Sequence, residues 1–177
     1  MITSLAVFCG SKIGKKEIYA HHAEKLGKLM AEKNIQMIYG GGRNGIMGVV
    51  ADAVMKKNGK VTGIIPHLLI EWETQHDSIT ELMIAEDMHI RKKKMYELCD
   101  AAIILPGGFG TLDELFEILT WNQLSIHDKQ IFILNSAGFY DDLLRHIDKL
   151  YNEGFLYDAA KERITVLSDP VELLNYL

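Results

Sequence analysis

Residues 106–117 of the sequence, PGGFGTLDELFE, place a glycine-rich turn directly before a run with helical periodicity. Glycines leave backbone N–H groups uncovered, and such groups at the start of a helix attract phosphate. Glu114 lies in the first part of the expected helix, where its carboxylate could act on a group attached to that phosphate. The segment therefore predicts an anion site with a carboxylate beside it.

Glu114 also fits a purely structural role. Thr111 could be the N-cap of the helix, with Glu114 at the third helical position reaching back to the Thr111 N–H in a capping box. Such a cap is common and stabilises a helix by about 1 kcal/mol. The segment taken alone leaves the cap and the catalyst open.

A basic segment at 88–99, MHIRKKKMYELC, bears on that choice. Arg91 lies three residues after Met88 and four before Met95, which is helical spacing. It is therefore expected on the inward, apolar stripe of a helix. A buried guanidinium needs an anion, and its planar fork suits either a carboxylate or a ligand phosphate. Lys92 falls at the border of the stripe. An inward Arg91 favours a catalytic Glu114 over a cap.

These residues need a scaffold, and short apolar runs alternate with helical patterns along the chain. Near-continuous apolar strands between helices indicate parallel strands covered on both faces. We therefore predict an α/β fold, a Rossmann-like doubly wound and mostly parallel sheet flanked by helices, in a single domain over 1–177. Strands are expected at 4–8, 36–39, 61–65, 81–85, 101–105, 131–134 and 164–167, helices at 15–33, 46–58, 88–99, 111–124, 140–153 and 170–177, and a loop at 66–79.

Three of the expected strands end in glycine-containing turns, at 9–11, 39–48 and 105–111. In a parallel sheet these turns fall on the carboxyl edge, where ligands bind. Their convergence strengthens the prediction of an anion site. A P-loop is not predicted, because the Walker pattern is absent, and the GGGRNG stretch follows the second strand, which argues against a dinucleotide fingerprint.

The bulk properties exclude several classes of protein. The net charge of −5 argues against a general nucleic-acid binder. No stretch approaches the length of a membrane span, and the first residues read as a strand and not as a signal peptide. The histidines and the two cysteines form no metal-binding pattern. We expect a cytoplasmic protein without a metal or a cofactor.

Four segments closely resemble the LONELY GUY (LOG) family, the cytokinin riboside 5′-monophosphate phosphoribohydrolases that have also been labelled lysine decarboxylases. PGGFGTLDE matches the family signature PGGxGTxxE, and MHIRKKKM resembles MHxRKxxM. YGGGRNGIMG resembles YGGGxxGLMG, and TWNQLSIHDKQI resembles TWxQLGxHxKP. Ser125 and Gln130 depart from the Gly and Pro that are common in the family, but they lie outside the signature.

The resemblance implies a homodimer or larger oligomer that hydrolyses the N-glycosidic bond of a purine nucleoside 5′-monophosphate. AMP or an N6-substituted AMP would give the free base and ribose 5-phosphate. The resemblance assigns catalytic roles to Arg91 and Glu114. It places substrate binding at Glu73, Lys92, Thr120, Gly41, Gly42, Gly107, Gly108, Phe109, Gly110, Thr111, Leu112 and Asp113.

A mechanism follows as a hypothesis. The N–H groups of the 107–111 turn hold the 5′-phosphate, and Glu114 stabilises the positive charge that develops on the sugar. Arg91 either orients Glu114 or contacts the nucleotide, and the sequence leaves both roles open. The preference between plain and prenylated adenine also stays open. Candidates for an apolar wall around the base are Met47, Trp72, Met95 and Trp121.

Three other functions remain in competition. A binding protein that carries a phosphorylated ligand without turnover could use the same glycine turns. A pyridoxal-phosphate lysine decarboxylase would need a lysine for the Schiff base, and Lys92 is its best candidate. A single-stranded DNA-binding domain is disfavoured by the acidic net charge.

Overall fold

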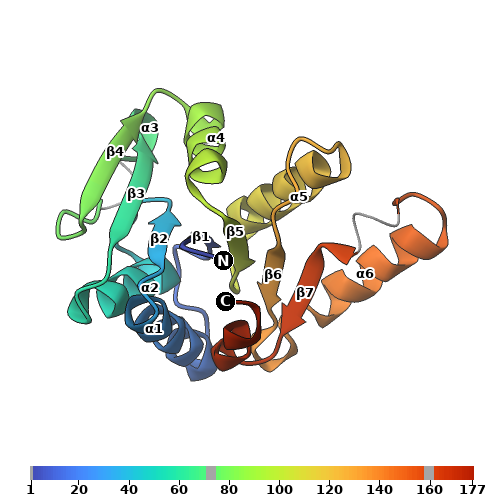
Figure 1. Ribbon diagram of the computed structural model, residues 1–177, viewed down its shortest axis with the longest axis horizontal. Helices are drawn as coiled ribbons and strands as arrows, with labels where there is room; N and C mark the ends of the chain where they lie inside the picture. The colour runs from blue at the N-terminus through green and yellow to red at the C-terminus, as the bar shows by residue number, and fades with distance from the viewer. Residues whose placement is uncertain (1, 71–74, 158–161) are drawn as a thin grey trace.

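A single seven-stranded sheet, with all strands parallel, runs through the molecule in the order β4-β3-β2-β1-β5-β6-β7 (Figure 1). The computed structural model describes residues 2–70, 75–157 and 162–177. The strands confirm the sequence prediction to within one residue at each end. They are β1 Ser4–Phe8, β2 Gln36–Tyr39, β3 Val61–Pro66, β4 Glu81–Ala85, β5 Ala101–Ile104, β6 Ile131–Leu134 and β7 Ile164–Leu167.

The helices also follow the expected order, with ends that differ from the prediction by up to two residues. They are α1 Glu17–Glu32, α2 Gly45–Lys56, α3 His67–Ile70, α4 Met88–Leu98, α5 Phe109–Gln123 and α6 Asp141–Asn152, with 3₁₀ segments η1 Ser136–Gly138 and η2 Pro170–Tyr176. The segment predicted as a loop at 66–79 contains the single turn α3. The helix predicted at 170–177 is a 3₁₀ helix, and α5 begins two residues before the predicted start at Thr111.

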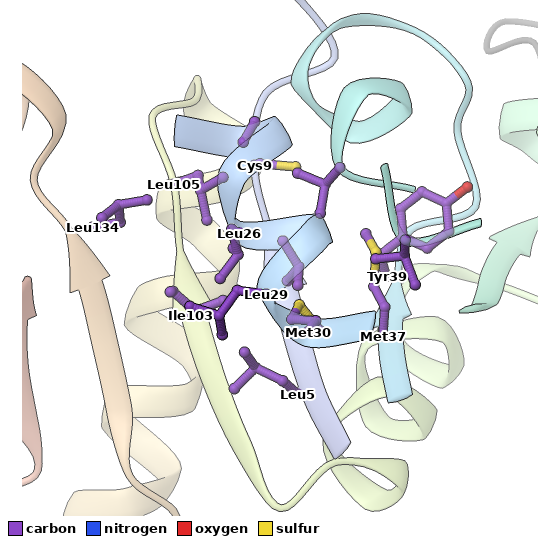
Figure 2. Close-up of a cluster of buried hydrophobic side chains, with 14 of the residues drawn as sticks. Leu5, Cys9, Leu26, Leu29, Met30, Met37, Tyr39, Ile103, Leu105 and Leu134 are labelled. Carbon is purple, nitrogen blue, oxygen red and sulfur yellow. The ribbon is translucent and has the colours of Figure 1, made fainter. Parts of the chain in front are cut away.

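Alternating side chains of the strands supply two cores, one on each face of the sheet. Leu5 and Val7 of β1 pack with α1 and α2, whereas Ala6 and Phe8 pack with residues of α4 and α5. Figure 2 shows the first of these cores, with Leu26 and Met30 of α1 over the strands. Both faces are therefore covered, which explains why the strands read as continuous apolar runs.

The strand order places a topological switch point beside β1. The chain moves from β1 outward through β2, β3 and β4, and then returns to place β5 on the other side of β1. The helices that follow β1 and β5 therefore leave on opposite faces of the sheet and open a crevice at the carboxyl edge. Among the described residues, no helix is long and apolar enough to span a bilayer.

Close backbone contact holds the turn after β1 against the start of α2. The Ile46 N–H donates to the Gly10 carbonyl at 3.1 Å. Gly45 has a φ of +63°, and a Cβ atom there would lie 2.3 Å from the Ser11 carbonyl carbon. Only glycine satisfies both conditions, because other residues would add a strained backbone and a clash.

We expect Gly45→Ala to lower the free energy of unfolding by about 3 kcal/mol or more, since the clash adds to the cost of the left-handed backbone. Urea denaturation measures the change. Gly154→Ala is the matched control, because Gly154 has a φ of +78° but open space where its Cβ would be. It should cost only about 1–2 kcal/mol. Equal losses in the two variants would contradict the proposed backbone contact.

Candidate active site

A cavity of about 210 Å³ lies at the carboxyl edge of the sheet, at the switch point. The turn after β1 supplies residues 9–11, and Gly40 comes from the end of β2. Arg91 and Met88 reach it from α4, and residues 108–111 with Asp113 and Glu114 reach it from α5. The structure thus brings together the two predicted catalytic residues and most of the predicted phosphate loop.

The first turn of α5 faces this cavity with its backbone. Gly108 is the N-cap, so the N–H groups of Phe109, Gly110 and Thr111 have no acceptor within the helix. A Cβ atom added to Gly108 or Gly110 would meet nothing within 4 Å. The turn therefore offers donors and free space together, which is what a phosphate group requires.

The capping box, which the sequence left open as an alternative, does not form. The N-cap is Gly108, which has no side chain to cap the helix, and not Thr111. Thr111 is instead the third residue of the helix and is buried, which places Glu114 a full turn further into α5 than the box requires. Glu114 lines the cavity and is only 8% exposed. The choice between cap and catalyst is thereby decided against the cap.

The Arg91 side chain is buried at the floor of the cavity, as the helical spacing predicts. Its Nε atom donates to the Ile64 carbonyl at 3.0 Å, and Nη2 donates to the Gly40 carbonyl at 3.3 Å. Nη1 lies 4.0 Å from Oε1 of Glu114. The two carbonyl contacts fix the plane of the guanidinium and aim its remaining edge at the carboxylate.

Gly40 makes room for this arrangement. A Cβ atom at this position would lie 1.9 Å from Nη2 of Arg91, so any side chain there would push the guanidinium away from Glu114. The resemblance pointed to Gly41 and Gly42, which are buried, with Gly41 packed against Ile64 and Ile65. The glycine that lines the cavity is the preceding one, Gly40.

Two ionisable groups that stay neutral lie near Glu114. Burial, followed by the charge of Glu114, raises the pKa of the Cys9 thiol. Burial, followed by the charges of Glu117 and Glu114, raises the pKa of Tyr96. Both groups therefore stay protonated at neutral pH, whereas Arg91 is a cation inside the cavity that can stabilise the Glu114 carboxylate.

Lys92 is buried, although the sequence placed it at the border of the stripe. Its Nζ atom lies 3.0 Å from both Asp113 and Glu117. Burial opposes its charge, but hydrogen bonds to the two carboxylates and their charges outweigh this effect and raise the pKa of Lys92. The residue is not among those that line the cavity.

Several predicted substrate residues lie elsewhere. Thr120 is exposed on α5, and its hydroxyl donates to the Phe116 carbonyl at 2.6 Å. Leu112 is partly buried against the core that contains residues of α4. Gly107 lies close to the Thr111 hydroxyl, because a Cβ atom at Gly107 would clash with it. Glu73 lies outside the described residues. The binding roles of these four positions stay predictions.

The candidates for an apolar wall divide in the same way. Met47 lines the cavity, whereas Met95 is fully buried in the core and Trp121 packs edge-on against Tyr96. Trp72 lies outside the described residues. Cys9 and Ser11 line the cavity from the 9–11 turn that the sequence analysis placed at this edge, whereas Met88 was not predicted to line it.

Comparisons with known proteins agree with this site. A family model described as "Possible lysine decarboxylase" matches residues 47–177. A cytokinin riboside 5′-monophosphate phosphoribohydrolase of Arabidopsis thaliana is 44% identical over 173 residues, which cover 98% of this chain and 80% of the relative. A rice protein (Oryza sativa subsp. japonica) with the same description, preceded by "Probable", is also 44% identical, with 98% and 71% covered.

The chain belongs to the LOG family. Its fold is also found outside that family. The molybdenum cofactor binding protein of Rippkaea orientalis superposes with a TM-score of 0.72 at 20% sequence identity. The superposition covers 99% of this chain and 97% of that chain. That likeness shows the fold alone. Within the LOG family signature, the geometry distinguishes residues that face the cavity from residues that support them.

Gly110 provides a test of the phosphate loop. We expect Gly110→Ala to leave the free energy of unfolding unchanged or to raise it by up to about 1 kcal/mol, because alanine is the better helix former. The new methyl group would occupy the open space in front of the loop and weaken binding of ribose 5-phosphate by about tenfold or more. Urea denaturation and calorimetric titration measure the two effects. Unchanged affinity in a folded variant would place the phosphate elsewhere.

Proposed function

We propose that this chain hydrolyses the N-glycosidic bond of a purine nucleoside 5′-monophosphate, AMP or an N6-substituted AMP, to the free base and ribose 5-phosphate. The observation that carries the proposal is the buried Arg91–Glu114 pair facing a helix start with open N–H donors. The names of the relatives support the same reaction.

The substrate fits the cavity in one direction. Its dianionic phosphate is placed on the N–H groups of residues 109–111, where the helix dipole also favours negative charge. Glu114 lies one turn further along α5, on the cavity side, so the ribose attached to the phosphate lies beside its carboxylate. The anomeric carbon is thereby brought beside the Glu114 carboxylate, next to the phosphate loop.

Glu114 acts on the bond that breaks. As the bond between C1′ and the base nitrogen lengthens, positive charge develops on the sugar, and the carboxylate stabilises it. Water adds to C1′, and its proton is accepted by Glu114, while the base leaves with the electron pair of the broken bond and takes up a proton from solvent water. Arg91 holds the carboxylate ionised and oriented, and its own position is fixed by the carbonyls of Ile64 and Gly40.

The alternative functions fit the geometry less well. A Schiff base with pyridoxal phosphate requires a free amine in the cavity. Lys92 instead pairs with two carboxylates and is not among the residues that line the cavity. A carrier needs to hold its ligand without reacting, which gives no reason to bury a carboxylate beside a guanidinium at the ligand site.

Glu114→Gln tests the reaction directly. The amide keeps the shape of the side chain but cannot accept the proton or stabilise the cation, so we expect kcat for base release from AMP to fall by about a hundredfold or more. Chromatography of the released adenine measures the rate. Glu24→Gln, an exposed position on α1, is the control and should keep full activity. Base release at the normal rate from Glu114→Gln would contradict the proposal.

We also propose that two copies associate through α5. Phe109 and Phe116 of this helix and Leu124 at its C-cap are exposed apolar side chains at helical spacing, and Phe109 is 93% exposed. Thr120 lies on the same stripe. An apolar stripe of this kind is typical of a protein interface, and the homodimer that the family resemblance implies would cover it. The buried free thiols Cys9 and Cys99 support a reducing, cytoplasmic location.

Leu124→Glu is expected to dissociate the dimer, because a charge buried in an apolar interface is not compensated. Sedimentation equilibrium of the wild type and the variant at equal concentration measures the mass. Val171→Glu, an exposed apolar position on η2, is the control and should not change the mass. A variant that keeps the dimer mass would exclude the α5 surface as the interface.

A further inference from the structure

Two adjacent cations of α4 contact different residues of α5. Arg91 Nη1 lies 4.0 Å from Glu114, whereas Lys92 Nζ lies 3.0 Å from Asp113 and 3.0 Å from Glu117. The two helices are thus joined by one cation that lines the cavity and one that does not. The positions of both cations are coupled, because they are consecutive residues of one helix.

Lys92 has its charge satisfied within the protein. Its side chain is 7% exposed, and the Glu117 carboxylate that it meets is itself 20% exposed. A substrate phosphate would have to displace these carboxylates or approach them, and like charges would oppose it. The contacts therefore suit a residue that supports the site, and not one that receives the phosphate.

Tyr96 extends the same contact by one helical turn. Its buried hydroxyl lies 3.1 Å from the Glu114 carbonyl oxygen and 3.2 Å from the Glu117 carboxylate, and it can donate to either. The backbone of Glu114 is thereby held on the side away from the cavity. Lys92 and Tyr96 together fix the rotation of α5 at the residue that carries the carboxylate.

We propose that Lys92 is a positioning residue, which holds α5 so that Glu114 faces Arg91 and which balances the surrounding carboxylates, and that it does not contact the substrate. This role rests on the proposed function of the site. It assigns to the second residue of the Arg-Lys pair a task different from the substrate binding that the family resemblance implies.

The charges around Glu114 make this role measurable. The described groups near it include the cation Arg91, the neutral Tyr96 and the neutral Cys9. Removal of Lys92 would take away the cation that contacts Asp113 and Glu117, two carboxylates on the helix that carries Glu114. The carboxylate form of Glu114 would then be harder to maintain, and the acid limb of the pH profile would move to higher pH.

The experiment is the pH profile of base release from AMP in the wild type, Lys92→Met and Glu117→Gln. We expect Lys92→Met to lower kcat by about tenfold to a hundredfold, with KM and the Kd of ribose 5-phosphate changed by less than about threefold. Its acid limb should move up by about half a pH unit, and that of Glu117→Gln should move down, because a carboxylate is removed instead of a cation. Lys93→Met, on the exposed neighbour, is the control.

A tenfold or larger loss of ribose 5-phosphate affinity in Lys92→Met would show a direct contact and overturn the proposal. Acid limbs that do not move in opposite directions would overturn it as well. If Lys92→Met does not fold, Glu117→Gln alone decides, since its acid limb must move down. A wild-type chain that releases no base would overturn the proposed function and this role together, whereas an active wild type with either contrary result overturns the role of Lys92 alone.

Discussion

The buried guanidinium of Arg91 is the interaction on which the site depends. Removing such a cation from water costs several kcal/mol, and the protein offsets this with two carbonyl contacts and a carboxylate at 4.0 Å. An ion pair at that distance contributes about 4 kcal/mol at an effective dielectric of about 20. The carbonyls come from Gly40, directly after β2, and from Ile64 within β3, so the sheet itself fixes where this cation lies.

This dependence explains why the site lies on regular elements. Arg91 is in the first turn of α4, Glu114 is in α5, and both helices pack on the same face of the sheet. The pair is therefore assembled before a ligand arrives, and no loop has to close to bring the two side chains together. Such preorganisation avoids a cost of reordering during the reaction.

Much of this arrangement could be predicted from the sequence because it rests on local patterns. The buried strands read as apolar runs, and the inward direction of Arg91 follows from helical spacing alone. The N-cap was missed because Gly108 adopts the extended conformation of a cap without a side chain to signal it. The partners of Lys92 were missed for another reason: Asp113 and Glu117 come from a different helix, and no local period reveals a contact between elements.

The glycines at the site fall into two groups with different consequences for divergence. Gly40 and Gly45 are required by the protein, because neighbouring atoms leave no room for a side chain. Gly108 and Gly110 border open space, so only a ligand can require them. A lineage of this fold that lost its ligand would therefore be free to accumulate side chains at these two positions first, while Gly40 would persist for as long as Arg91 remained buried. The order in which the glycines are lost would thus record when a member of the fold gave up the reaction.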